Sequence, residues 1–221
     1  MGLGLQPGWT TVVLNVTVVG ATGPGYVQVG PAGQTVPGAS STLNVERAGQ
    51  TLANVTIVTV GPSQDIMLYT RGGGHFVVDL IGDFGGDQSY VPLDPYRAYN
   101  SRCGTCSSLA AGGYRDVQIA GTGPQGARYN GVPNGLPTSS VVVSVTADSP
   151  VANGFMSAVA TSVVPPMPTS TANFQAGRTV TGLSVVPLDE NGRIRVYSSV
   201  GAHFQVDVLG FFSRDVSGGG F

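Results

Sequence analysis

Several residue types are scarce or absent in this chain of 221 residues, and each absence narrows the functions that it can have. There is no lysine, and charged residues make up only 10% of the chain, well below the roughly 25% of an average soluble domain. A net charge of −2 and the lack of any basic run argue against nucleic-acid binding, which needs a basic patch. No stretch reaches the roughly 18 apolar residues of a membrane span, so we expect no membrane insertion.

Histidine is also scarce, and its two positions do not predict a catalytic or metal site. His75 and His203 are each followed four residues later by an aspartate, Asp79 and Asp207. Four residues of strand span about 13 Å, so these pairs cannot touch directly, and no Ser or Cys motif completes a triad. A metal site needs two or three converging ligands. We therefore predict no catalytic residue, metal or cofactor, and interpret Asp79 and Asp207 as structural carboxylates that accept hydrogen bonds from loop backbone or an arginine.

Glycine and proline are abundant, at 34 and 15 residues, and hydrophobic residues make up 41% of the chain. The glycines follow no Gly-X-Y period, which excludes collagen, and runs rich in valine, isoleucine and threonine lie between them. Such runs suit half-buried strands, whereas glycine and proline are typical of turns. The composition predicts an all-β fold with a sizeable core.

One strand-like segment occurs twice, at residues 74–84 and 202–212. The segments before each copy also align, so the chain contains an internal repeat. Strict alternation of apolar and polar residues in both copies predicts which side chains face the core. They are Phe76, Val78 and Leu80 in the first copy, and Phe204, Val206 and Val208 in the second.

The repeat divides the chain into units at residues 1–86 and 87–221. The first unit has six predicted strands, at residues 10–19, 26–29, 41–45, 52–60, 65–70 and 74–84. The second unit repeats these strands and adds two leading strands, at residues 90–99 and 114–120. We predict an all-β protein of two tandem β-sandwich units, jelly-roll or immunoglobulin-like, of which the first lacks its two leading strands.

Two finer predictions concern side chains of these strands. In residues 10–19 the alternation places Asn15 and Thr17 on the face opposite the buried valines, as in a strand with one buried side. Asn44 and Asn173 occupy matching places in the two units. Because asparagine bonds to its own backbone in turns, we predict that each caps a bend.

The leading segment of the second unit carries a resemblance to a known family. It reads Pro92-Leu93-Asp94-Pro95-Tyr96-Arg97, followed by Asn100-Ser101-Arg102. This resembles the P-x-x-P-x-R-x-x-D-T-R opening of a tandem repeat of secreted actinobacterial proteins. Residues 117–121, 131–133, 141–146, 173–177 and 206–212 continue the resemblance over nearly the whole chain. Asn100 stands where the family usually has aspartate, and Cys103 and Cys106 are unusual additions.

The resemblance implies an exported protein at the cell surface, where such repeats lie in tandem beside amidases, proteases or other wall-associated domains. It implies no defined activity. The opening residues lack the basic region of a signal peptide, so we expect the chain to be a piece of a longer protein. In an exported protein, Cys103 and Cys106 are expected to form a short loop disulfide, since one C-x-x-C pair cannot build a four-ligand zinc site and precedes no helix of a βαβ unit.

Aromatic and arginine side chains gather in the leading segment and define a possible surface for a glycan or a partner. Aromatic faces can stack on sugars, although core packing or an interface explains such residues equally well. The residues are Tyr90, Tyr96, Arg97, Tyr99, Arg102, Tyr114 and Tyr129.

A sandwich that lacks two strands exposes unpaired backbone and an apolar groove. We predict that a neighbouring chain fills this gap by strand addition or close packing, which in head-to-tail form can build a filament. The rival explanation is that residues 1–9, with Trp9 as a plug, or residues 213–221 cover the edge.

The sequence thus predicts a non-enzymatic, extracellular structural or adhesive repeat protein. The alternative is a cell-wall or glycan-binding module that targets an attached enzyme.

Overall fold

The computed structural model describes residues 11–60, 63–84, 88–121, 131–133 and 138–214. Every regular element in this part of the chain is a β-strand, as the composition predicted. Within the same residues, no helix is long and apolar enough to cross a membrane. The chain divides into two compact units, Met1–Gly86 and Asp87–Phe221, which are described separately.

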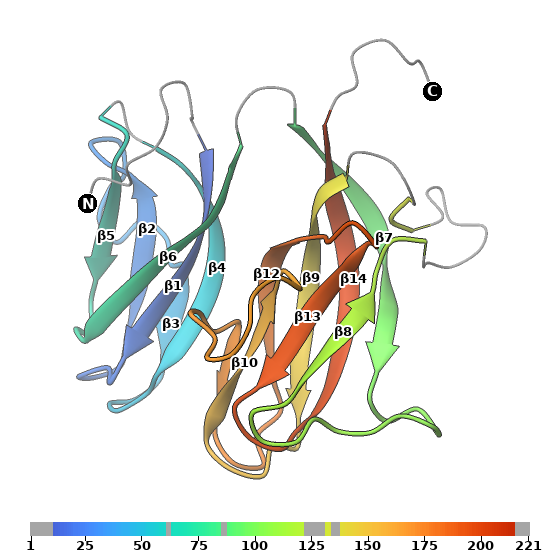
Figure 1. Ribbon diagram of the computed structural model, residues 1–221. Helices are drawn as coiled ribbons and strands as arrows, with labels where there is room; N and C mark the ends of the chain where they lie inside the picture. The colour runs from blue at the N-terminus through green and yellow to red at the C-terminus, as the bar shows by residue number, and fades with distance from the viewer. Residues whose placement is uncertain (1–10, 61–62, 85–87, 122–130, 134–137, 215–221) are drawn as a thin grey trace. The chain divides into compact units, whose positions relative to one another are not determined.

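Unit 1 is a sandwich of two antiparallel three-stranded sheets (Figure 1). One sheet has the strand order β4-β1-β6 and the other β3-β2-β5. The strands are β1 (Thr11–Val19), β2 (Gly25–Pro31), β3 (Leu43–Val45), β4 (Leu52–Thr59), β5 (Ile66–Thr70) and β6 (His75–Phe84). The six predicted strands are therefore confirmed, with boundaries that differ by at most two residues at each end.

Unit 2 is a sandwich of two antiparallel four-stranded sheets, and Figure 1 shows β8 and β13 in front of β9 and β14. The sheets have the orders β12-β9-β14-β7 and β11-β10-β13-β8. The strands are β7 (Gln88–Asn100), β8 (Tyr114–Gln118), β9 (Thr138–Asp148), β10 (Gly154–Val159), β11 (Ala172–Phe174), β12 (Val180–Pro187), β13 (Arg193–Ser198) and β14 (His203–Arg214).

The internal repeat extends to strand pairing and register. The order β4-β1-β6 corresponds to β12-β9-β14, and β3-β2-β5 corresponds to β11-β10-β13. Even the bulges coincide: the register of β6 on β1 shifts between Leu80 and Gly82, and that of β14 on β9 shifts between Val208 and Gly210. Among the described residues of unit 1, strands β7 and β8 have no counterparts, and no described strand pairs with the edges of β6 and β5 that they would cover. The prediction that unit 1 lacks two leading strands is confirmed.

The core of unit 2 confirms the predicted faces of its last strand. Phe204, Val206 and Val208 of β14 are fully buried and pack with residues from both sheets. Phe204 also stacks on Tyr99 of β7, with ring centroids 4.8 Å apart. Strand β7 thus completes the core of unit 2 as well as its sheet.

The core of unit 1 corrects the prediction for β6. Phe76 and Val78 pack against it but are only partly buried, and Leu80 is 43% exposed. The equivalent of Leu80 in unit 2, Val208, lies opposite Tyr96 of β7. Because no strand of the described residues pairs with this edge of β6, the side chain that alternation assigned to the core remains in contact with solvent.

Strand β1 corrects a second expectation, because both of its faces are buried. Asn15 and Thr17, predicted on an open face, are 2% and 7% exposed. Strand β1 lies between β4 and β6, and these neighbours enclose its shorter side chains on the outer face. Position within the sheet, which alternation does not report, decides this burial.

Candidate functional site

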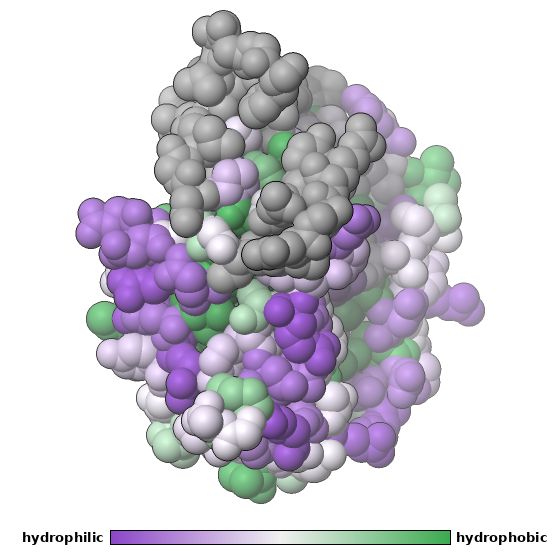
Figure 2. Space-filling model, turned by 90° about the vertical axis from the view of Figure 1, so that its right-hand side faces the viewer, coloured by the Kyte–Doolittle hydropathy of each residue, from purple (hydrophilic) through white to green (hydrophobic). Residues whose placement is uncertain are grey.

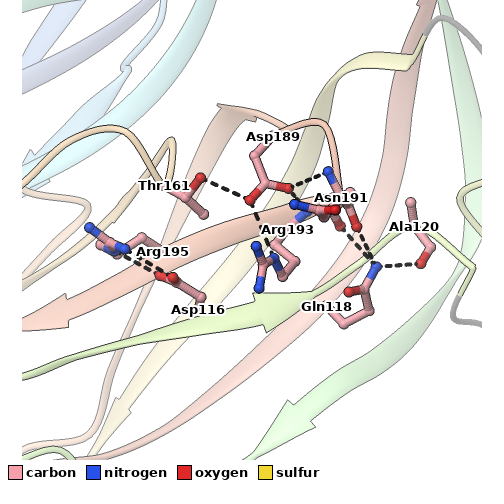
Figure 3. Close-up of polar contacts among 9 residues, drawn as sticks. Asp116, Gln118, Ala120, Thr161, Asp189, Asn191, Arg193 and Arg195 are labelled. Carbon is pink, nitrogen blue, oxygen red and sulfur yellow. Dashed lines mark hydrogen bonds and ion pairs between the residues drawn. The ribbon is translucent and has the colours of Figure 1, made fainter.

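A cluster of polar side chains surrounds Asp189 in the turn between β12 and β13 (Figure 3). The Asp189 carboxylate accepts hydrogen bonds from the backbone N–H groups of Asn191 and Arg193, at 2.9 and 2.8 Å. It also accepts the Thr161 hydroxyl at 2.9 Å and the Arg193 Nε at 3.3 Å. Beside it, the Gln118 amide of β8 donates to the carbonyl groups of Ala120 and Asn191, both at 2.9 Å.

The electrostatics of this cluster indicate a structural role. Burial acts against the charged form of Asp189, but the hydrogen bonds from the Arg193 backbone, the Thr161 hydroxyl and the Asn191 backbone outweigh it. They hold the pKa of this carboxyl below its ordinary value, so Asp189 is ionised at neutral pH. A general acid or base needs a pKa near the working pH and a free position toward a substrate. Asp189 instead organises the turn.

A second charged pair lies on neighbouring strands of the same sheet. The Arg195 guanidinium of β13 forms two hydrogen bonds with the Asp116 carboxylate of β8, at 2.7 and 2.9 Å. Arg195 also donates to the Val163 carbonyl at 3.1 Å, and its guanidinium lies 4.0 Å from the centroid of the Tyr114 ring. The bond to Asp116 raises the pKa of Arg195. All these contacts hold β8, and the loop that contains Val163, on the sheet.

The leading segment of unit 2 is attached to the sandwich by ion pairs and contains the disulfide. Cys103 and Cys106 are bonded to each other, as expected for this C-x-x-C pair in an exported protein. The Arg97 guanidinium of β7 binds the Asp207 carboxylate of β14 through two hydrogen bonds of 2.8 and 3.0 Å. Arg102 pairs with Asp148, and this contact, together with the Ser149 hydroxyl, holds the pKa of Asp148 below its ordinary value.

The tyrosines of the proposed glycan or partner surface are divided between the core and the exterior. Tyr96 and Tyr99 pack against the core of unit 2, and Arg115 lies 5.5 Å from the Tyr99 ring centroid. Tyr90 and Tyr114 are 47% and 49% exposed, on β7 and β8, which belong to different sheets. Tyr129 lies outside the described residues. On the face in Figure 2, hydrophobic residues are scattered among hydrophilic ones in the described part of the chain.

The two histidines have different surroundings, although their sequence contexts match. The Ser101 hydroxyl lies 3.0 Å from Nδ1 of His203 and accepts the backbone N–H of Phe204 at 2.8 Å. His75 of β6 is exposed. Among the described residues, no group of three or more His, Cys, Asp or Glu side chains is placed to hold a metal ion.

The structural roles predicted for the paired asparagines and aspartates are confirmed only in part. Asn44 and Asn173 lie in the middle of β3 and β11, so the predicted bend is wrong, and the Asn173 amide donates to the Ser170 hydroxyl at 3.0 Å. Asp207 accepts an arginine, one of the two kinds of donor expected for it. Asp79 instead accepts the Asn15 side-chain amide at a long 3.4 Å.

These differences between matching positions identify the candidate site as the β6 edge. The term means the backbone edge of β6 on the side away from β1, together with the strand residues Phe76, Val77, Asp79, Leu80 and Gly82. Val77 and Leu80 are 47% and 43% exposed. The corresponding edge of β14 is covered by β7 over nearly its whole length. Exposed sheet edges with apolar side chains are templates for pairing with another chain, so this edge is suited to bind a strand.

Sequence reasoning missed the charged pair Asp116–Arg195, the hydrogen bonds of Asp189 within its turn and the role of Ser101. The partners in the first pair are 79 residues apart, and no local pattern signals their contact. One available signal was overlooked: Gly82 and Gly210 occupy the same place in the repeat, inside strands where glycine is unfavourable unless another group approaches closely.

Comparisons with known proteins do not assign the chain to a family. No known family matches the sequence, and no curated protein matches it. A structure of the Gx strain of infectious bursal disease virus aligns with 96% of this chain at 10% identity and a TM-score of 0.29, and this chain spans 60% of that one. A structure of the Gt strain aligns with 93% at 12% identity and a TM-score of 0.23, and 57% of it is spanned. Similarity at this level carries no argument about function.

Proposed function

We propose that this chain is a non-enzymatic structural repeat module of an extracellular or cell-surface assembly, and that its β6 edge receives a strand from a neighbouring chain. The observation that carries the proposal is the difference between the two units. They share six strands in the same order and register, but in the described residues both sheets of unit 1 end where those of unit 2 continue into β7 and β8.

The physical argument concerns the unpaired backbone and apolar side chains at that edge. Each backbone hydrogen bond that a new strand forms contributes about 0.5–1.5 kcal/mol net, and partly exposed Phe76, Val77 and Leu80 offer apolar area to bury. Addition of a strand to an exposed sheet edge is a common mode of protein recognition. An open edge in one unit of a repeat therefore favours an assembly role.

Other features support the structural and extracellular parts of the proposal. The charged groups of the Asp189 cluster and the Asp116–Arg195 pair are occupied by internal hydrogen bonds that hold turns and strands. The disulfide between Cys103 and Cys106 is compatible with an oxidising compartment. The resemblance to repeats of secreted actinobacterial proteins points in the same direction. The glycan-binding alternative has less support, because Tyr96 and Tyr99 pack against the core.

The test measures the molar mass of the full chain as its concentration rises, by sedimentation equilibrium or light scattering. We expect association that Val77→Lys reduces strongly, because a charge on the strand edge opposes pairing. The matched control is Val151→Lys, at a valine that is 75% exposed and lies outside the strands, which should associate like the unaltered chain. A chain that remains monomeric at millimolar concentration, with β6 amides protected from exchange, would overturn the proposal.

A further inference from the structure

We propose that the strand received by the β6 edge has the side-chain chemistry of β7: an arginine that binds Asp79, and a tyrosine seven residues before it that lies over Gly82. This inference rests on the function proposed above and specifies the partner, a β7-type strand of another protein chain. The argument compares what holds β7 on β14 with what unit 1 retains at the same positions of β6.

Several side-chain contacts attach β7 to β14 in unit 2. Arg97 binds Asp207 through two hydrogen bonds, and Tyr99 stacks on Phe204. Tyr90 covers Gly210 so closely that a Cβ atom there would lie 2.5 Å from its ring, and its hydroxyl donates to the Leu209 carbonyl at 3.3 Å. The Tyr90 ring can lie this close to β14 because position 210 is a glycine, and the carboxylate at position 207 has a bidentate partner.

Unit 1 has the same residues on β6, but its described part contains no strand that pairs with them. Asp79, Gly82 and Phe76 match Asp207, Gly210 and Phe204, as the paired registers of β6 on β1 and β14 on β9 show. A Cβ atom on Gly82 would meet nothing within 4 Å. In the described residues, no arginine contacts Asp79.

The two strands are copies of one repeat, but not every position is the same. Val77 replaces Gln205, and Asp83 replaces Phe211. The residues that receive β7 side chains in unit 2 are retained in unit 1, even though nothing in the described part of unit 1 requires a glycine at position 82. A bound β7-type strand supplies a reason for Gly82 and a bidentate partner for Asp79, which in the described residues accepts the Asn15 amide at 3.4 Å.

The register in unit 2 determines how the incoming strand lies. Arg97 is opposite Asp207, Tyr96 is opposite Val208 and Pro92 is opposite Gly210. The same register on β6 places the incoming arginine opposite Asp79, an aromatic residue opposite Leu80 and a proline opposite Gly82. Proline in this strand is tolerated because β7 is itself an edge strand.

The inference applies to β7 and not to β8. In unit 2, Asp116 of β8 is held by Arg195 of β13. The residue of β5 that matches Arg195 is Met67, which cannot bind a carboxylate in this way. Unit 1 therefore retains the receiving residues on the edge of sheet β4-β1-β6 and not on the edge of sheet β3-β2-β5.

The test uses a fluorescein-labelled peptide with the sequence of residues 87–101, titrated into the full, unaltered chain and followed by anisotropy. We expect saturable binding that is weakened about tenfold or more by Arg97→Ala or Tyr90→Ala in the peptide, because each removes a charge-assisted or aromatic contact. Hydrogen exchange should show protection of β6. These peptide variants leave the protein unchanged, so misfolding cannot explain the loss.

Variants of the chain test the receiving residues. Asp79→Arg should abolish binding, and a peptide with Arg97→Asp should restore it. Asp83→Ala, at the neighbouring carboxylate of β6 that has no counterpart in β14, should bind the unaltered peptide normally. Equal affinity for the Arg97→Ala peptide, or protection of β14 instead of β6, would overturn the inference.

The outcomes also separate this inference from the proposed function. If the peptide does not bind but the chain still associates in a manner sensitive to Val77→Lys, the partner has different chemistry and only this inference fails. If the peptide does not bind and the chain is a monomer with a protected β6, residues of the same chain cover the edge and both proposals fail.

Discussion

Phe204 and Phe76 occupy the same place in the two units, and their replacement by alanine measures what the missing strands contribute. Phe204 is fully buried and stacks on Tyr99 of β7 at 4.8 Å. Removing a buried phenylalanine costs about 3–5 kcal/mol, because both the transfer of the ring and the cavity left behind contribute. We expect Phe204→Ala to destabilise unit 2 by this amount.

Phe76→Ala should destabilise unit 1 by much less. The Phe76 ring is only partly buried, and β6 has no β7-type neighbour to stack on it in the described residues. A partly exposed ring has less area to lose, and solvent can enter the space that it leaves. We expect a loss of about 1–2 kcal/mol, below the range for a buried ring.

Hydrogen exchange with peptide-level resolution measures both effects in the full chain at low micromolar concentration. Phe204→Ala should accelerate exchange in peptides of β9 and β14, and Phe76→Ala should accelerate exchange in peptides of β1 and β6 to a smaller extent. Val151→Ala, at an exposed loop position, serves as the control and should change neither unit. Equal losses in the two units would mean that the β6 edge is covered in the dilute chain, and the reasoning would be refuted.

Three further predictions concern unit 2. The pKa values of Asp148 and Asp189 lie below the ordinary value of about 4, so in acid the folded unit binds fewer protons than the unfolded chain. Urea unfolding should therefore find a constant free energy of unfolding from pH 7 to 5, and a decrease as the pH drops through the folded pKa values. A free energy of unfolding that rises in acid would contradict the assignment. Replacing Cys103 and Cys106 by serine should lower the free energy of unfolding by about 2 kcal/mol, the entropy of so short a loop, and thiol titration of the denatured, unreduced chain should find no free thiol. Gly182→Ala should lower the free energy of unfolding of the unit by about 1–3 kcal/mol, because a Cβ atom there collides with the Thr171 carbonyl. Urea unfolding measures this change. An unchanged urea midpoint would show that β11 and β12 can move apart without loss of stability.

The sequence by itself predicted the strands and their repetition, because both depend on local patterns. Alternation with a period of two residues marks a strand, and glycine or proline marks its end, whatever lies elsewhere in the chain. Alignment of residues 74–84 with 202–212 then required two similar units, and the surplus of strands before the second copy showed what the first lacks. The topology agrees, since β7 and β8 have no counterparts among the described strands of unit 1.

Local patterns could not predict how deeply each strand residue is buried. Leu80 and Val208 have the same alternation, yet one is 43% exposed and the other is fully buried. The cause is the neighbouring strand β7, which pairs with β14 and has no counterpart on β6 among the residues that the structure describes. Asn15 shows the opposite error, because the flanking strands bury a side chain that alternation assigned to the open face.

Only the tertiary structure decided which side chains meet. Arg97 and Asp207 are 110 residues apart, and Arg195 and Asp116 are 79 apart, so their pairing depends on strand order and register that the sequence does not state. The role of Gly82 also depended on the tertiary structure. It became a candidate receiving site only when Tyr90 was found over Gly210, because a glycine reports a close approach only when the approaching group is known.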